Sequence, residues 1–224
     1  MRIVLRIGGS VVASPVNTDL MSKYVEIVQN LKKQSHEVVV VVGGGALARE
    51  FIAIAKKLGL EEQAQDEVAI SVSRLFAQLF LKKLGEIGCK KVALTLDDAA
   101  EGLSEGKIVV MGGLKPGITT DAVAALVAER VEGELLVKGT NQEGIYTSDP
   151  QKNPVAVKLD HLSFDDLQGI FSESQHKAGM HQIVDPEAIK VLKRNRVKLI
   201  VVSGFKPENI LAAVNGENVG TVVN

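Results

Sequence analysis

Residues 38–45 read VVVVVGGG, a run of five valines that ends in three glycines. A short run of β-branched residues without polar alternation is typical of a strand that is covered on both faces of a sheet. After the glycines, Leu47, Phe51 and Ile54 recur at helical spacing and predict a helix with one apolar face. The stretch therefore predicts a strand, a glycine turn and a helix in succession, as in an α/β protein.

Four more apolar runs have the same character as the valine run. They span Ile3–Ile7, Ile108–Met111, Leu135–Val137 and Leu199–Val202. Helical patterns lie between the runs, at residues 20–31, at 66–87 with Gly88 as a stop signal, at 122–131, and from Asp185-Pro186 to about Arg194. This alternation predicts a three-layer α/β/α sandwich with a mainly parallel central sheet.

The composition fits one large α/β domain or two closely joined lobes. The 224 residues carry a formal net charge of -1, and the pI is about 6.4, so no electrostatic field favours nucleic acid or an anionic membrane as a partner. The longest apolar run, Val38–Val42, is far shorter than the roughly 20 residues of a membrane helix. Cys89 is the only cysteine, which excludes an internal disulfide framework and fits a cytoplasmic location.

Three glycine clusters each follow a predicted strand directly: Gly8-Gly9-Ser10, Gly43-Gly44-Gly45 and Gly112-Gly113. In an open parallel sheet, ligands bind beyond the carboxyl ends of the strands, where glycine lets the backbone approach an anion closely. For any one cluster a tight turn explains the glycines as well as phosphate binding does, whereas three clusters at equivalent strand ends favour phosphate. The P-loop motif and the dinucleotide motif G-x-G-x-x-G are both absent, which disfavours a P-loop ATPase and a Rossmann dehydrogenase.

Residues 111–122, MGGLKPGITTDA, resemble the signature of the amino acid kinase superfamily and are most similar to that of the archaeal-type uridylate (UMP) kinases. Three more motifs occur in the family's order, at Ile7–Ser10, at Val42–Gly45 with Arg49, and at residues 138–150. The resemblance covers nearly the whole chain. It implies a single domain over residues 1–224 with a soft division near residue 130. Residues 1–130 would form an acceptor-binding lobe with the catalytic glycine loops, and residues 131–224 an ATP-binding lobe.

The resemblance also implies an activity, the reversible ATP-dependent phosphorylation of UMP to UDP in pyrimidine nucleotide biosynthesis. Phosphoryl transfer requires mainly alignment and charge neutralisation. The catalytic residues that the resemblance implies are Asp121, Lys138, Gly9 and Gly44. By residue type alone, a helix cap is the favoured interpretation of Asp121, and a solvated lysine at a strand edge is the alternative for Lys138. Mg²⁺ is expected with ATP, and because no dedicated carboxylate cage is visible, phosphates and water would hold it.

The resemblance implies two binding sites. The ATP site would comprise Gly9, Ser10, Gly45, Arg49, Thr140, Asn141, Tyr146 and Asp149. The UMP site would comprise Gly44, Asp66, Leu114, Lys115, Pro116, Gly117, Ile118, Thr119 and Thr120, with Asp66 accepting from the ribose hydroxyls. Taken alone, Asp66 is a carboxylate at a helix start, Arg49 a surface arginine and the stretch from Thr140 a polar loop. Residues 172–182, rich in Ser, Gln, His and Gly, are interpreted as a loop near the nucleotide.

One position departs from the family pattern. Many members carry a lysine two residues before the first glycine, where this chain has Arg6. A guanidinium is a broad fork and an ammonium a point charge, so the two are not equivalent phosphate ligands. Pairing of Arg6 with Asp121 or another carboxylate is the alternative.

The partners implied by the resemblance are UMP, ATP and further copies of the chain, in a homohexamer built as a trimer of dimers.

Two other functions stay open. One is a related kinase for a carbamate, acylglutamate or isopentenyl phosphate acceptor, although no histidine lies between Gly45 and Asp66, where isopentenyl phosphate kinases have one. The other is a non-catalytic protein that binds nucleotides or oxyanions, against which the presence of both Asp121 and Lys138 argues.

Overall fold

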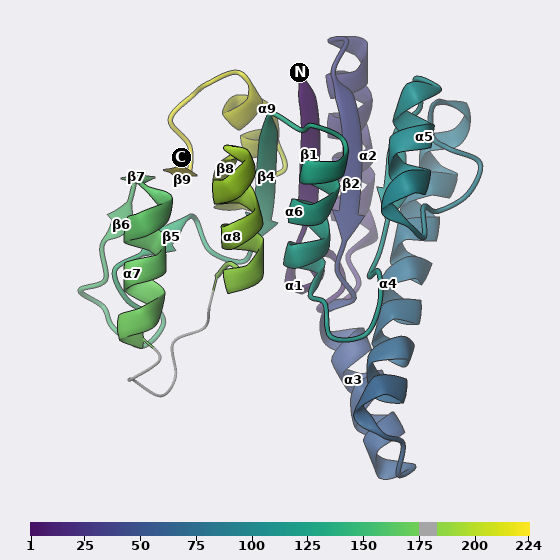
Figure 1. The fold of residues 1–224 in the computed structure, drawn as a ribbon, viewed down its shortest axis with the longest axis horizontal. Coiled ribbons are helices and arrows are strands. Elements are labelled where there is room, and N and C mark those ends of the chain that lie inside the picture. The colour runs from purple at the N-terminus through teal and green to yellow at the C-terminus, as the bar shows by residue number, and fades with distance from the viewer. Residues whose placement is uncertain (175–182) are drawn as a thin grey trace.

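The computed structural model describes residues 1–174 and 183–224 and is built around a seven-stranded sheet (Figure 1). In chain order the strands are β1 (Arg2–Ile7), β2 (Glu37–Val42), β3 (Val109–Met111), β4 (Leu135–Thr140), β7 (His161–Leu162), β8 (Lys198–Ser203) and β9 (Thr221–Val223). Across the sheet their order is β3-β2-β1-β4-β8-β9-β7, and only β8 and β9 pair antiparallel. The mainly parallel sheet is confirmed.

The helices follow the strands in the expected alternation. They are α1 (Gly9–Val12), α2 (Thr18–Lys33), α3 (Gly45–Lys57), α4 (Glu62–Leu84), the 3-10 helix η1 (Gly85–Ile87), α5 (Leu96–Ser104), α6 (Thr120–Arg130), α7 (Phe164–Ser174), α8 (Pro186–Asn195) and α9 (Glu208–Val214). A small antiparallel pair, β5 (Ile145–Tyr146) and β6 (Lys158–Leu159), stands apart from the sheet. The side chains of Asn17, Thr119 and Asp185 accept hydrogen bonds from first-turn amides and so fix the starts of α2, α6 and α8.

Helices cover both faces of the sheet and produce the predicted three layers. Side chains such as Leu5 and Val40 point to one face and form a core with α2, α4 and α9. Their neighbours Val4 and Val39 point to the other face and form a second core with α5, α6, α7 and α8. The central strands are therefore apolar at every position, because residues of both parities are buried.

Helices α3 and α4 extend together beyond one end of the sheet (Figure 1). There the apolar face expected for α3 is present but uncovered, since Phe51 is 43% and Ile54 45% exposed. On α4, Leu75 and Leu79 are 53% and 49% exposed. Although α4 has 23 residues, none of the helices within residues 1–174 and 183–224 is long and apolar enough to cross a membrane.

The structure confirms the five predicted strands and corrects several boundaries. The long helix begins at Glu62, so Asp66 lies in its second turn and not at its start, and it ends at Leu84 because Gly85, not Gly88, breaks it. Helices α1, α5, α7 and α9 and the short strands β5, β6, β7 and β9 were not predicted. Of the loop expected at residues 172–182, residues 172–174 belong to α7, and the rest lie outside the described residues.

Candidate active site

The first two glycine clusters interlock beyond the carboxyl ends of β1 and β2. A Cβ on Gly9 would lie 2.1 Å from the amide nitrogen of Gly45, and one on Gly45, where φ is 61°, would lie 2.2 Å from the carbonyl oxygen of Gly9. No larger residue fits at either position without displacing the backbone. Ser14 bridges the same two loops, because its hydroxyl donates to the Gly9 carbonyl over 3.1 Å and accepts from the Ala46 amide over 2.6 Å.

The carboxyl end of β4 joins this arrangement. The amide of Gly8 donates to the carbonyl of Gly139 over 2.9 Å, and the amide of Gly43 donates to that of Ile7 over 3.1 Å. Because β1 lies between β2 and β4 in the parallel sheet, the carboxyl ends of the three strands lie at one edge. The prediction that glycine clusters gather at equivalent strand ends is therefore confirmed for the clusters after β1 and β2. The third cluster, Gly112-Gly113, follows β3, the parallel neighbour of β2, at the same edge.

A mostly buried charged cluster lies at the same edge and consists of Arg6, Asp121 and Lys138, whose side chains are 14%, 13% and 7% exposed. Arg6 on β1 and Lys138 on β4 are register partners, and Asp121 lies in the first turn of α6. Arg6 Nε lies 2.7 Å from Asp121 Oδ1, as an ion pair without the geometry of a directed hydrogen bond, while Lys138 Nζ donates to Asp121 Oδ2. Lys138 is 5% exposed and lies within β4, so the alternative of a solvated lysine at the strand end is wrong.

The three charges set each other's protonation. Burial alone would raise the pKa of the Asp121 carboxyl, but Arg6 and Lys138 outweigh it and hold that pKa below its ordinary value. Burial lowers the pKa of the Lys138 ammonium, and the Asp121 carboxylate opposes this shift. Capping of α6 falls to Thr119, whose hydroxyl accepts from the Ala122 amide, so Asp121 is not the helix cap. Its carboxylate instead lies between two cations.

Asp185 is a member of this site that the sequence did not assign. Its carboxylate accepts from the Thr119 hydroxyl over 2.5 Å, and its backbone amide contributes to the lowered pKa of the Asp121 carboxyl. Two residues earlier, the carbonyl of Ile183 accepts from Lys138 Nζ. The Asp185-Pro186 signal correctly predicted the cap of α8, whereas the contact with Thr119 joins segments far apart in the sequence, which no local pattern indicates.

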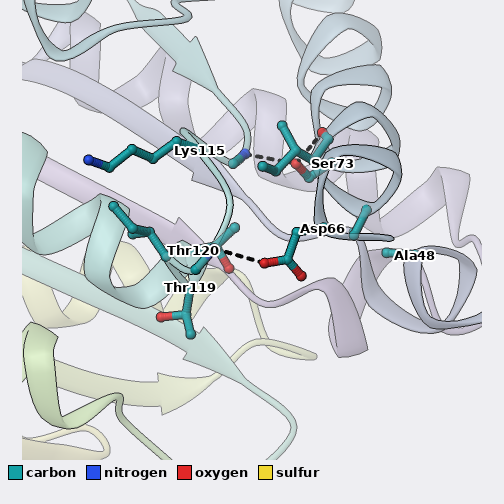
Figure 2. A pocket seen from close by; sticks show the side chains of 12 residues that line it. Ala48, Asp66, Ser73, Lys115, Thr119 and Thr120 are labelled. Atoms are coloured by element: carbon teal, nitrogen blue, oxygen red, sulfur yellow. Dashed lines mark hydrogen bonds between the residues drawn. The ribbon is translucent and has the colours of Figure 1, made fainter. Parts of the chain in front are cut away.

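A cavity of about 400 Å³ opens between α4 and the loop from β3 to α6 (Figure 2). Of the residues expected to bind the acceptor, those that line it are Gly44, Asp66, Lys115, Gly117, Ile118, Thr119 and Thr120. The hydroxyl of Thr120 also accepts from an Arg6 terminal nitrogen over 2.8 Å. Thr120 thus connects the cavity to the charged cluster.

The cavity lining differs from the expected acceptor residues in both directions. It includes Ala48, Ala69, Ile70, Ser73 and Gly113, which the sequence did not suggest. It does not include Leu114 or Pro116. The side chain of Leu114 instead packs, partly buried, against the core on the α6 side of the sheet. Asp66 Oδ2 accepts from the Gly117 amide over 2.8 Å (Figure 2), so this carboxylate already supports the loop.

The expected ATP residues are placed less uniformly. Thr140 is buried at the end of β4, and its hydroxyl lies 3.3 Å from the Asn141 side-chain oxygen. Tyr146 lies on β5, and Asp149 accepts from the Gln151 amide over 3.0 Å within its own turn. Arg49 is exposed on α3. Within residues 1–174 and 183–224, no hydrogen bond or ion pair connects Tyr146, Asp149 or Arg49 to the charged cluster.

Known proteins resemble this chain over its full length. The amino acid kinase family matches residues 1–203. The uridylate kinase of Methanocaldococcus jannaschii is 41% identical over 225 residues, covering 100% of this chain and 99% of that protein. The crystal structure of Archaeoglobus fulgidus uridylate kinase matches with a TM-score of 0.90 at 39% identity and covers 100% of both chains. Bacillus anthracis UMP kinase, with a TM-score of 0.81 at 20% identity over 100% of this chain and 95% of that one, shares the fold. These matches, together with the four motifs in order, make the chain a member of the amino acid kinase family.

Proposed function

We propose that this protein is a UMP kinase, which transfers the γ-phosphoryl group of ATP to UMP and releases UDP and ADP in pyrimidine nucleotide biosynthesis. The observation that carries the proposal is the position of Thr120, which lines the cavity and accepts from Arg6 of the charged cluster. An acceptor in the cavity would thus lie next to buried cations. Archaeal relatives about 40% identical over the full length are named uridylate kinases, which supports the choice of acceptor.

The charged cluster would align and neutralise the reacting phosphates. A phosphate oxygen of UMP attacks the γ-phosphorus of ATP, the bond to the bridging oxygen breaks, and ADP leaves with its electron pair. Lys138 Nζ donates to Asp121 and to the Ile183 carbonyl, which leaves one of its three N–H groups for a phosphate oxygen. Asp121 would hold both cations in place, and the backbone at Gly9 and Gly44 would approach the transferred group.

The acceptor would bind in the cavity through α4 and the loop that follows β3. A volume of about 400 Å³ lies within the usual range of small-molecule sites, roughly 300–1,000 Å³. Gly117 uses only one oxygen of Asp66, so the other remains to accept from the ribose hydroxyls. The residues of the loop, including Leu114 and Pro116, would then surround the uracil and phosphate.

We place the donor on the other side of the cluster, with residues 1–130 as the acceptor lobe and 131–224 as the ATP lobe. Gly9, Ser10 and Gly45 would contact phosphates, and Thr140, Asn141, Tyr146 and Asp149 would contact the nucleoside. In the described part of the chain no three carboxylate, histidine or cysteine side chains gather as a metal site, and Asp121 is engaged by two cations. Mg²⁺ would therefore enter with ATP, held by phosphates and water, and supply charge neutralisation.

We propose that the protein forms a homohexamer, a trimer of dimers, in the cytoplasm. Exposed apolar residues on α3, at its end and on α4 support the self-association. Phe51, Ile54, Leu58, Leu75 and Leu79 are each more than 40% exposed. Faces of this kind on a folded monomer mark interaction sites. Light scattering after size exclusion checks the mass, which should be six times 23.9 kDa; a monomer would contradict the proposal.

A panel of acceptors tests the activity. ADP release from Mg-ATP is measured with UMP, CMP, carbamate, acetylglutamate and isopentenyl phosphate. The proposal predicts that UMP gives the highest kcat/KM. Release with another acceptor but not with UMP would assign a different kinase activity, and ATP binding without acceptor-dependent release would identify a binding protein.

A further inference from the structure

Two neighbouring residues of α4, Ser73 and Arg74, bind the backbone of the acceptor loop, which is the segment 112–119 between β3 and α6. Neither residue belongs to the charged cluster. The Ser73 hydroxyl accepts from the Gly113 amide over 2.7 Å (Figure 2). The Arg74 guanidinium donates from Nε to the Gly113 carbonyl over 3.0 Å and from a terminal nitrogen to the Leu114 carbonyl over 2.9 Å. Three hydrogen bonds therefore connect α4 to two consecutive residues of the loop.

The packing between the helix and the loop leaves little freedom. A Cβ on Gly112 would lie 2.7 Å from the Arg74 amide nitrogen and 2.8 Å from Ser73 Oγ. Ser73 is 3% exposed, and its own hydroxyl donates to the Ile70 carbonyl over 2.7 Å. The loop consequently leaves β3 pressed against the helix backbone, and the serine hydroxyl is oriented to accept from Gly113.

The Arg74 guanidinium binds backbone carbonyls of the loop and does not neutralise a carboxylate. In the described part of the chain it has no ion pair with a carboxylate, and the hydrogen bonds of its side chain go to the two loop carbonyls. A guanidinium can reach two carbonyls at once because its nitrogens form a rigid fork, which an ammonium cannot reproduce.

The same helix also holds the far side of the loop. Asp66 lies two turns before Ser73 on α4 and accepts from the Gly117 amide over 2.8 Å. Residues 115 and 117–120, which line the cavity, follow the segment fixed by Ser73 and Arg74. The position of the cavity wall relative to Asp66 is therefore set by contacts from one rigid helix.

We propose that Ser73 and Arg74 are positioning residues for the acceptor, which fix the loop at the distance from Asp66 that binds the nucleoside monophosphate. The inference rests on the proposed UMP kinase function and deepens it. Without these hydrogen bonds the loop would have to be ordered by the acceptor itself, so that the acceptor binds more weakly whereas ATP is unaffected.

Steady-state kinetics of the full chain with Mg-ATP and UMP test the proposal in Arg74→Ala, Arg74→Lys and Ser73→Ala. The control is Gln78→Ala, one turn further along the exposed side of α4. Because each loop hydrogen bond contributes about a fivefold effect, loss of both Arg74 bonds should raise the KM for UMP about 25-fold in Arg74→Ala. Arg74→Lys, which can keep one bond at most, and Ser73→Ala should each raise it at least about fivefold. The KM for ATP, and both constants of the control, should stay within about twofold.

The conservative variant separates positioning from charge, since Arg74→Lys retains the cation and should not restore the KM for UMP. An unchanged KM for UMP in the Arg74 variants, or an equal rise in the KM for ATP, would overturn the inference. So would failure of Arg74→Lys to fold, because the residue would then stabilise the whole chain. If the unmodified protein shows no UMP-dependent turnover, the proposed function falls and this inference with it.

Discussion

The guanidinium of Arg6 lies 2.7 Å from the carboxylate of Asp121, so a side chain of the first strand pairs with one at the start of α6. Lys138 occupies the second oxygen of the same carboxylate. The arginine that departs from the family's lysine has therefore not lost a place at the site. It is a fixed partner of Asp121 and also donates to Thr120 at the cavity wall.

This geometry predicts that Arg6→Lys is not a neutral change. A lysine reaches Asp121 or Thr120 but cannot contact both, so we expect kcat to fall about tenfold, the effect of one lost charge-assisted hydrogen bond. Arg2→Lys on the same strand is the matched control. Arg2 pairs with Glu37 at the surface and should leave kcat within about twofold. An Arg6→Lys enzyme as fast as the unmodified one would show that the double contact has no role.

Asp121→Asn separates catalysis from binding. The asparagine amide keeps the shape of the side chain but carries no negative charge to hold Arg6 and Lys138 in place. The two cations would then no longer be aligned with the reacting phosphates. We expect kcat to fall about a hundredfold or more, with the Kd for UMP changed less than about threefold. Turnover and calorimetric UMP binding are measured on the same preparation. An undiminished kcat would remove Asp121 from the mechanism.

The charge balance of the cluster predicts that Asp121→Asn destabilises the fold more than Lys138→Met does. Asp121→Asn leaves two buried cations without a carboxylate and should lower the free energy of unfolding by about 3 kcal/mol. Lys138→Met leaves the Arg6–Asp121 pair intact and removes a buried ammonium whose pKa burial already lowers, so it should cost less than about 1 kcal/mol. Urea unfolding at neutral pH gives both values, and the reverse order would refute this account of the cluster.

The interlocked glycines predict that Gly9→Ala is severe. Its Cβ would lie 2.1 Å from the Gly45 amide nitrogen, so one loop must move, at a cost of about 1–3 kcal/mol in the free energy of unfolding and with loss of most activity. Gly169→Ala in α7, where a Cβ meets no atom within 4 Å, should instead stabilise the protein by about 0.5 kcal/mol. Thermal unfolding and ADP release compare the two. Equal behaviour would mean that the glycine loops are not in contact.

The central layers of the fold could be predicted from the sequence because the central strands are buried on both faces and leave uninterrupted apolar runs such as Val38–Val42. Strand β9 could not be predicted in the same way. It begins with the polar Thr221, so its apolar run is only Val222-Val223, and it pairs antiparallel with β8. The pattern of α3 correctly predicted an apolar face, but amphipathicity does not indicate whether the same chain covers that face.

The candidate site divides along the same line. Residues inside motifs, such as Asp121 and Thr120, could be predicted because the motif orders them along the chain, and both lie at the candidate site. Ser73 and Asp185 were missed because their contacts, to Gly113 and to Thr119, join segments that only the folded chain brings together. Asp66 was expected at the start of the long helix, but it lies in the second turn, since α4 begins at Glu62, earlier than the sequence pattern indicated.

The most direct test of the whole account is the identity of the products. Phosphorus NMR follows ATP, Mg²⁺ and UMP with a catalytic amount of the protein. If the protein is a UMP kinase, ADP and UDP appear in equal amounts, and ATP remains intact when UMP is left out. Formation of ADP and inorganic phosphate at the same rate with and without UMP would contradict it.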